Sequence, residues 1–197
     1  MTTMEYHNPV LLQASVDGLN IKPDGIYVDV TFGGGGHSKE ILKRLGPAGK
    51  LFAFDQDEDA LANALKDERF TLINENFRFI KRFLRFYGVK SVDGVLADLG
   101  VSSHQFDVPE RGFSTRFDAD LDMRMSQKND LNAYRVVNEY DEQDLRRVFY
   151  DYGELKNAPA LARTIIEGRE HYPIKTTDEL KDILAKYLPE RVRNKVL

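Results

Sequence analysis

The chain has 197 residues, of which 42% are hydrophobic and 30% are charged, and its formal net charge is −4 at pH 7. This composition is typical of a globular protein, and the length allows one domain with a substantial insertion. The absence of cysteine excludes a disulfide framework, and the four histidines show no metal-ligand spacing. No apolar run approaches the ~20 residues of a membrane span, and the first residues lack a signal-peptide pattern, so we expect a cytoplasmic protein without a membrane partner.

Short apolar runs alternate with helical patterns over the first half of the chain. The runs predict strands at residues 26–31, 51–55, 70–73 and 92–99, and the periodic segments between them predict helices at 37–45, 59–65 and 79–87. Alternation of this kind indicates a parallel sheet with right-handed crossovers. We therefore expect an α/β, Rossmann-like fold.

The pattern changes after residue 100. Residues 100–126 form a polar stretch without a clear period, and helices are predicted at 141–150, 158–169, 176–188 and 190–197. Thr176 and Glu179 have the spacing of a capping box at the start of one of these helices. The expected domains are an α/β domain at 1–107, an active-site loop at 108–126 and a helical substrate domain at 127–197.

The fourth predicted strand, residues 92–99, has no following strand to cover it in this chain. A four-stranded parallel sheet would leave that edge exposed. We expect the remainder of the sheet to lie beyond residue 197; the alternative is that a second subunit, in a homodimer, covers the edge.

A glycine-rich turn follows the first predicted strand. Asp29 ends the strand, and four consecutive glycines, 33–36, precede a helical pattern. Glycine allows the backbone to approach a ligand closely, and the helix start offers free N–H groups. Ser38 occupies the third glycine position of the dinucleotide fingerprint, whereas Asp29, Gly33 and Gly35 have the spacing typical of S-adenosylmethionine-dependent methyltransferases. A plain flexible turn is the structural alternative.

Asp55 ends the second predicted strand, 20 positions after Gly35. An acid at about this distance binds a nucleotide ribose in doubly wound folds, because a carboxylate accepts hydrogen bonds from both hydroxyls. Its alternative role is a helix N-cap, for which Asp57 is better placed. We also expect a valine at Gly35 to block the pocket while leaving the fold largely intact.

Basic residues cluster in two places although the chain is acidic overall. One cluster consists of Arg78, Lys81, Arg82, Arg85 and Lys90, and the other of Arg191, Arg193 and Lys195. Either cluster is explained by a solvated helix face, or by a local RNA-binding patch.

Several sequence blocks together resemble the bacterial ribosomal RNA small subunit methyltransferase H family, also called the MraW family. The blocks are HNPVLL (7–12), TFGGGGHS (31–38), FDQD (54–57), NF (76–77), VDG (92–94), DLGVSS (98–103) with Gln105, ERGFS (110–114) and LDMRM (121–125). They follow the order of the family and span nearly the whole chain. A later Ser-Phe-His-Ser block of the family is absent.

The resemblance implies an activity and a set of site residues. Members of the family transfer a methyl group from S-adenosylmethionine to the exocyclic N4 of a cytidine in the decoding region of 16S rRNA, and they carry a helical domain inserted after strand four. The residues implied as cofactor contacts are Gly35, Gly36, His37, Asp55, Phe77, Asp98 and Gln105. Asp98 is also the candidate catalytic acceptor, and Phe106, Phe113 and Phe117 are candidates for receiving the target base.

Two functions from other classes remain as alternatives. A nicotinamide-dependent oxidoreductase could use the same strand, glycine turn and helix, although the third glycine is missing. A non-catalytic RNA-binding or assembly protein could retain the cofactor pocket. Methylation at C5 of a pyrimidine is disfavoured, because it needs a cysteine thiolate and the chain has none.

Overall fold

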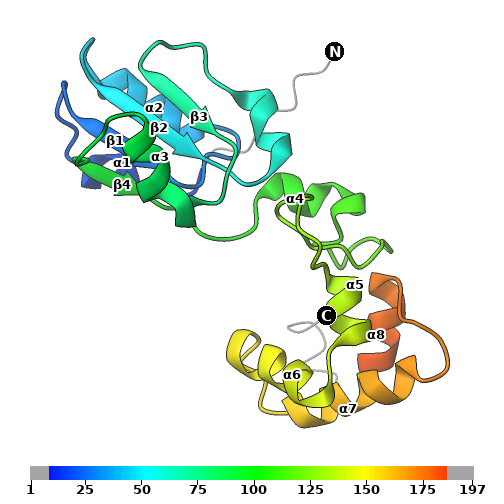
Figure 1. The fold of residues 1–197 in the computed structure, drawn as a ribbon. Coiled ribbons are helices and arrows are strands. Elements are labelled where there is room, and N and C mark those ends of the chain that lie inside the picture. The colour runs from blue at the N-terminus through cyan, green and yellow to red at the C-terminus, as the bar shows by residue number, and fades with distance from the viewer. Residues whose placement is uncertain (1–8, 186–197) are drawn as a thin grey trace. The chain divides into compact units, whose positions relative to one another are not determined.

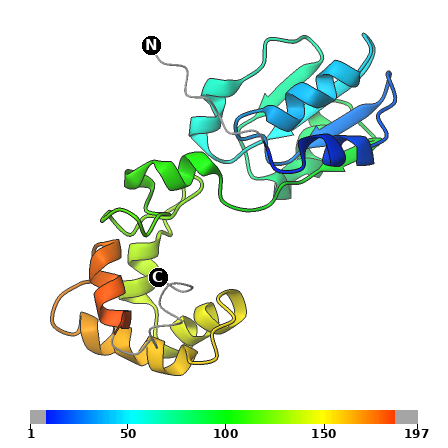
Figure 2. The ribbon, with the colours of Figure 1, turned by 180° about the vertical axis from the view of Figure 1, so that it is seen from behind.

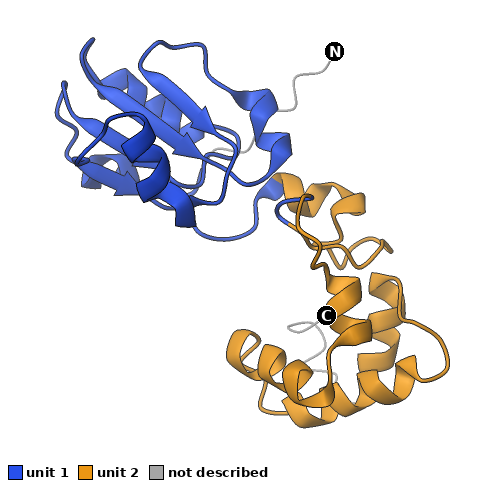
Figure 3. Ribbon diagram, in the orientation of Figure 1, with its two compact units in different colours: residues 1–103, 125–127 blue, residues 104–124, 128–197 orange. Residues whose placement is uncertain are grey.

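The computed structural model describes residues 9–185 and forms two compact units. Of the described residues, the first comprises 9–103 and 125–127, and the second comprises 104–124 and 128–185 (Figure 3). We call them the α/β unit and the helical unit. In residues 9–185, no helix has the length and apolar composition needed to cross a bilayer.

The α/β unit is built on a parallel four-stranded sheet, which confirms the predicted Rossmann-like fold class (Figure 1). The strands are β1 (Ile26–Asp29), β2 (Lys50–Phe54), β3 (Phe70–Ile73) and β4 (Gly94–Leu96). Their order is β3-β2-β1-β4, and Val28 of β1 aligns with Phe52 of β2 and Val95 of β4. The first strand, β1, is therefore central: β2 and β3 follow on one side of it, and β4 pairs with its other side.

Alternating side chains of the central strands build a core on each face of the sheet. Tyr27 and Leu51 pack with Val16 of α1 (Leu12–Gly18) and Ile41 of α2 (Gly36–Arg44), and Figure 2 shows both helices over that face. Val28, Phe52 and Phe54 form the opposite core, where side chains of α3 (Ile80–Phe86) cover them. This two-sided burial accounts for the apolar runs that predicted the strands.

Local sequence signals placed most elements of the α/β unit but not all their limits. The predicted helix at 59–65 is a 3-10 helix, η1 (Glu58–Asn63), and Asp57 caps it by accepting a hydrogen bond from the Asp59 N–H at 3.1 Å. The predicted helix at 79–87 is η2 (Phe77–Phe79) followed by α3. The helix α1 had no counterpart among the predicted elements.

The fourth strand is shorter than the predicted range 92–99. β4 covers three residues and pairs only with β1 in the described sheet. After Leu96 the backbone leaves the ladder, and the Asp98 N–H donates to the Thr31 Oγ1 at 2.8 Å. No strand of the described residues pairs with the other side of β4, so within residues 9–185 the edge is open, as expected. Val95, in the middle of β4, is 48% exposed.

The helical unit begins inside the stretch that was predicted to be an irregular loop. That prediction was wrong in part, because α4 (Ser103–Asp107) and η3 (Pro109–Arg111) lie within it. These elements are too short to show a helical period in sequence. Residues 125–127, at the other end of the stretch, belong to the α/β unit.

Four α-helices and one π-helix build the rest of the described helical unit. They are α5 (Ala133–Glu139), α6 (Glu142–Arg147), η4 (Val148–Tyr152, the π-helix), α7 (Ala158–Arg169) and α8 (Thr177–Ala185). Leu121, Val137, Leu145, Leu161 and Ile165 lie in their common core.

The predicted capping box at the start of α8 is confirmed. Thr176 Oγ1 accepts from the Glu179 N–H, and Glu179 Oε2 accepts from the Thr176 N–H, each at 3.3 Å. The two bonds satisfy backbone groups that a helix start leaves without a partner. The predicted helix at 190–197 and the end of the predicted helix at 176–188 lie outside the described residues.

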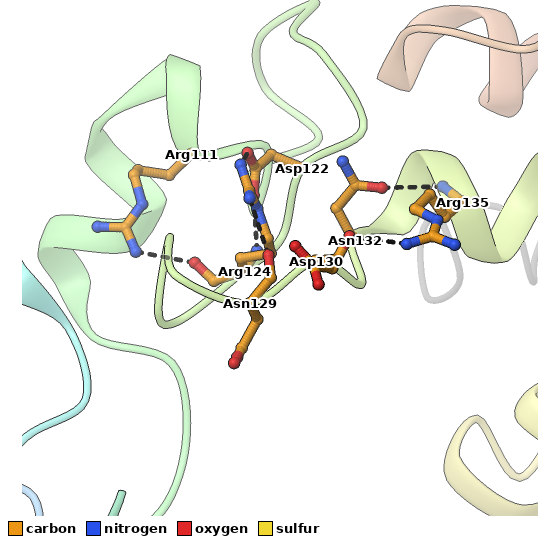
Figure 4. A network of polar contacts seen from close by, with 7 residues as sticks. All are labelled: Arg111, Asp122, Arg124, Asn129, Asp130, Asn132 and Arg135. Atoms are coloured by element: carbon orange, nitrogen blue, oxygen red, sulfur yellow. Dashed lines mark hydrogen bonds and ion pairs between the residues drawn. The ribbon is translucent and has the colours of Figure 1, made fainter. Parts of the chain in front are cut away.

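A polar network fixes residues 111–135 of the helical unit (Figure 4). The Arg124 guanidinium donates to both carboxylate oxygens of Asp122 at 2.9 and 2.7 Å, and to the Asn129 carbonyl at 2.9 Å. Arg111 is buried and donates to the Arg124 carbonyl at 2.9 Å. The hydrogen bond from Arg124 lowers the pKa of Asp122. Two sequence blocks of the family resemblance thus form one structural clamp.

This clamp predicts that Arg124→Lys destabilises the helical unit. A lysine cannot bind a carboxylate through two parallel N–H groups, so we expect a loss of about 1–2 kcal/mol in the free energy of unfolding. Urea unfolding followed by circular dichroism measures the loss. Arg135→Lys is the matched control, because Arg135 and its partner Glu139 are half exposed, and its expected effect is under about 0.5 kcal/mol. Equal effects of the two variants would contradict the assignment.

Candidate functional site

The candidate site lies where the four strands end. In a parallel sheet all carboxyl ends share one edge, which is where open α/β sheets bind ligands. The glycine turn, residues 31–36, follows β1 at this edge, Asp55 follows β2, Phe77 follows β3 and Asp98 follows β4. Four of the elements that sequence reasoning selected are therefore neighbours in the sheet order β3-β2-β1-β4.

A buried carboxylate connects β1 to α2 across the turn. Asp29 has no exposed surface; its Oδ2 accepts from the Ser38 hydroxyl at 2.7 Å and its Oδ1 from the Thr31 N–H at 3.1 Å. Burial raises the pKa of Asp29, and the two hydrogen bonds oppose that shift. The two bonds fix the start of the turn and the first turn of α2 relative to the end of β1.

A second carboxylate holds the turn from β2. Asp55 Oδ2 accepts from the Gly33 N–H at 2.7 Å, and Oδ1 accepts from the Asp57 N–H at 2.9 Å. Asn63 donates from the other side, to the Gly33 carbonyl at 3.1 Å. Each carboxylate oxygen has further acceptor capacity, so Asp55 can shape the turn and still accept from a ligand.

The glycines of the turn have different structural demands. Gly35 has φ +75°, and a Cβ there would lie 2.9 Å from the Phe32 ring. The expectation that valine at Gly35 leaves the fold largely intact is therefore wrong, because both the backbone and the neighbouring ring forbid it. Gly33 also has a positive φ, of +49°, but a Cβ there would meet open space. The open side of the turn lies at Gly33.

His37 lies in the first turn of α2 and is 5% exposed. Within residues 9–185, its Nε2 has no hydrogen-bond partner. An unsatisfied buried ring nitrogen costs stability, and such groups are rare in folded proteins. A polar ligand group at the turn would remove that cost, which fits a cofactor bound there.

Residues after β3 and β4 complete the candidate site at the carboxyl ends of the strands. Phe77, on η2, is 41% exposed and belongs to no hydrophobic core cluster of the described residues, so its ring can stack on a ligand. The Asp98 carboxylate is exposed and has no hydrogen-bond partner among residues 9–185, although its N–H is bound to Thr31. Asp98 thus presents a free acceptor at the ligand-binding edge.

Gln105 is the one predicted contact that belongs to the helical unit. It was placed in a loop by sequence reasoning, but it lies in α4 and is buried. Its predicted role as a cofactor contact stays a prediction.

Sequence reasoning missed several residues that shape the edge. Ser38 and Asn63 fix the turn, and Thr31 binds the backbone of Asp98. Asn74 donates to the Asp55 carbonyl at 3.0 Å. A hydroxyl or amide one or two residues after a strand, as at Asn74 and Thr31, is a weak signal for such a role. Ser38 and Asn63 lie farther from a strand end, and the partners of these residues are up to 67 positions away.

Two further features of residues 9–185 bear on whether a second site exists. No three His, Cys, Asp or Glu side chains in residues 9–185 are grouped so that they could hold a metal ion. The helical unit has an open groove of about 550 Å³ between α6, η4 and the start of α7. Arg146 and Arg147 line it together with Glu142 and Asp151, so its charges are mixed.

The buried Asp29 predicts a distinctive pH dependence. Because its pKa in the folded protein is above the ordinary 3.8, its contribution to stability is complete below that value and is lost as the pH rises through the folded pKa. Asp29→Asn removes this titration. The stability of the wild type relative to Asp29→Asn should therefore increase as the pH falls through the raised folded pKa toward the ordinary value of 3.8. Urea unfolding at a series of pH values measures it.

Asp93→Asn supplies a control of opposite sign. The hydrogen bond from the Ile26 N–H, together with Lys22, lowers the pKa of Asp93. Its stabilising contribution is present above 3.8 and is lost as the pH falls through the lower folded pKa. The same trend in both variants would contradict the roles given to the two carboxylates.

Comparison with known proteins identifies the family. Relatives called ribosomal RNA small subunit methyltransferase H are 88% identical over 196 residues in Flavobacterium johnsoniae, 73% over 187 in Flavobacterium psychrophilum and 68% over 197 in Christiangramia forsetii. These alignments cover 100%, 95% and 100% of this chain, but only 65%, 64% and 65% of the relatives.

One solved structure, described as a candidate methyltransferase of an antibiotic biosynthesis pathway from Anabaena variabilis, is 14% identical, with a TM-score of 0.37 over 78% of this chain and 64% of that chain. That similarity is too low to support any conclusion. The family model described as the MraW methylase family matches residues 4–197. The resemblance drawn from the sequence blocks is confirmed, and the chain belongs to the MraW methylase family.

Proposed function

We propose that this chain contains the cofactor site of an enzyme that methylates the exocyclic N4 of a cytidine in the decoding region of 16S rRNA, with S-adenosylmethionine as the methyl donor. The observation that carries the proposal is a glycine turn held by two carboxylates, Asp29 and Asp55, beside the free acceptor Asp98. Membership of the MraW methylase family supports it, as do the names of the relatives. The chain spans about two thirds of the length of those relatives.

The residues at the carboxyl ends of the strands suit this cofactor in their polarity and in the open side of the turn. The turn is open at Gly33, and the proposed contacts of the methionine part are Gly35, Gly36 and His37. Asp55 is proposed to accept from the ribose hydroxyls and Phe77 to stack on adenine, while Gln105 is proposed as a contact from the helical unit. The exposed ring of Phe77 and the remaining acceptor capacity of Asp55 support these roles.

The bound cofactor supplies an electrophilic methyl group on a sulfonium, so the protein needs to align the groups and not to activate the donor. The structure favours alignment, because the Thr31 and Asp55 side chains and Asn63 fix backbone groups of the edge through hydrogen bonds of 2.7–3.1 Å. A site fixed in this way loses little freedom when its ligands bind.

Asp98 is proposed as the acceptor for the cytosine amine. The lone pair of that amine is delocalised into the ring, so it is a weak nucleophile. A carboxylate that accepts from its N–H favours the form in which the lone pair points at the methyl group, and it stabilises the positive charge that develops on N4. The base must first leave its stack, and Phe106, Phe113 and Phe117 of the helical unit are proposed to receive it.

The ribose role predicts that Asp55→Ala weakens S-adenosylmethionine binding by about 1.5–3 kcal/mol, the range for a hydrogen bond to a charged group. Calorimetry on the full-length protein measures the affinity. Asn63→Ala is the control, because it also removes a hydrogen bond to Gly33 but offers no acceptor to a ribose. If both variants lose the same affinity, Asp55 serves only to hold the turn.

The acceptor role predicts that Asp98→Asn slows single-turnover methylation of immature 30S particles by about 10²-fold, the scale for one preorganised electrostatic contact. Asparagine keeps the shape and one acceptor oxygen but loses the negative charge, so the affinity for S-adenosylmethionine should change much less. Both quantities are measured on one full-length preparation. A fall of both by the same factor would make Asp98 a cofactor-holding residue.

A further inference from the structure

A cluster of exposed basic residues lies on α3 and just before and after it in the chain. It consists of Arg78, Lys81, Arg82, Arg85 and Lys90, and all five side chains are exposed. We call it the α3 basic face. Residues 76–92 contain no Asp or Glu, whereas the whole chain has a net charge of −4. The inner side of the helix packs into the core through Ile80, Phe83 and Leu84, so the basic side is directed to solvent.

The α3 basic face differs from the other charged helix surfaces of the described chain. Within residues 9–185, none of its five cations forms an ion pair. In α2, α5, α6 and α8, by contrast, basic residues pair with acids three or four positions away, as Arg44 does with Glu40 and Arg135 with Glu139. If the only role of this helix surface were contact with solvent, we would expect it to carry both acidic and basic residues, as the other helices do.

The arrangement also has a cost for the helix. Lys81 and Arg85 are four residues apart, and Arg82 and Arg85 are three apart, so like charges are neighbours on one surface. Such pairs destabilise a helix by a few tenths of a kcal/mol each. Within residues 9–185 no ion pair offsets this repulsion, and the one contact of these cations with a ring is that of Arg78 over Phe79, at 4.5 Å. The unpaired charges are therefore available to an external anion.

Exposed aromatic rings accompany the cations. Phe86, at the end of α3, is 81% exposed, and its ring contacts that of Tyr87 at 5.2 Å between centroids. Interleaved cations and exposed aromatic rings are the surface that single-stranded nucleic acid requires, because the cations bind phosphates and the rings stack on bases.

We propose that the α3 basic face binds the sugar-phosphate backbone of the RNA substrate. The inference rests on the proposed function, which supplies RNA as the polyanion, and it adds a place where that RNA is held. Three of the five cations are arginines, whose planar guanidinium matches a phosphate through two donors. An acidic membrane surface is the alternative polyanion, because exposed aromatic rings beside cations also suit a bilayer interface. The proposed function favours RNA, and binding to anionic vesicles is an outcome of the test.

The test measures how RNA affinity depends on salt. Fluorescence anisotropy with labelled oligouridylate gives the slope of log K against log salt concentration, about −0.7 per phosphate contact for a single strand. Arg82→Gln/Arg85→Gln removes two cations and should make the slope shallower by about 1.4. The control, Lys43→Gln/Lys50→Gln, removes the same charge from α2 and from the start of β2, and its slope should stay that of the wild type.

Each outcome has a definite meaning. A shallower slope only in the α3 variant, with an unchanged melting temperature, supports the proposal. The proposal is overturned if the slope of the α3 variant is unchanged, or if both variants change their slopes equally. It is also overturned if the α3 variant loses binding to phosphatidylserine vesicles while its RNA binding persists. The proposed function is tested separately. If the wild type binds RNA through the α3 basic face but does not methylate 30S particles, the RNA-binding proposal stands and the proposed function is wrong. If the wild type methylates 30S particles but the slope is the same in the α3 variant, the RNA-binding proposal is wrong and the proposed function stands.

Discussion

The buried hydrogen bond between Ser38 and the Asp29 carboxylate is the interaction on which the rest of the site depends. It fixes α2 to the end of the central strand across a turn that glycine alone would leave loose. A buried carboxylate is costly unless it is hydrogen-bonded, so this group commits the chain to one arrangement of the turn. Gly35 then adopts a left-handed backbone conformation that favours glycine, and the Phe32 ring leaves no room there for a Cβ atom.

The remaining strand ends are assembled around that turn. β2 contributes the Asp55 carboxylate to the Gly33 N–H, and β4 contributes the Asp98 N–H to the Thr31 hydroxyl. Polar residues at the carboxyl ends of the strands thus have two roles. They hydrogen-bond the backbone of the turn, and in the proposed function they also bind the ligand. Asp98 keeps its carboxylate for the second use, and His37 keeps its Nε2.

Sequence patterns predicted the parts of this architecture that depend on local chemistry. The strand at 70–73 and the helix at 158–169 have the predicted limits, since apolar periodicity and breakers define both. The short β4 could not be predicted, because its length depends on pairing with β1 and on the bond to Thr31. Helix α1 was missed because no side chain caps it and its Val16 is buried only by tertiary packing. The glycine turn, Asp29 and Asp55 were predicted from their spacing in the sequence. The hydrogen bonds that Ser38 and Asn63 make with the turn were not predicted, because contacts between distant residues leave no local signal.

The central claim is that the carboxyl edge of this sheet is a site for S-adenosylmethionine. Calorimetric titration of the full-length protein with S-adenosylmethionine and, separately, with NAD tests it most directly. We expect saturable binding of S-adenosylmethionine at one site per chain and no heat of binding with NAD. Saturable binding of NAD without binding of S-adenosylmethionine would contradict it.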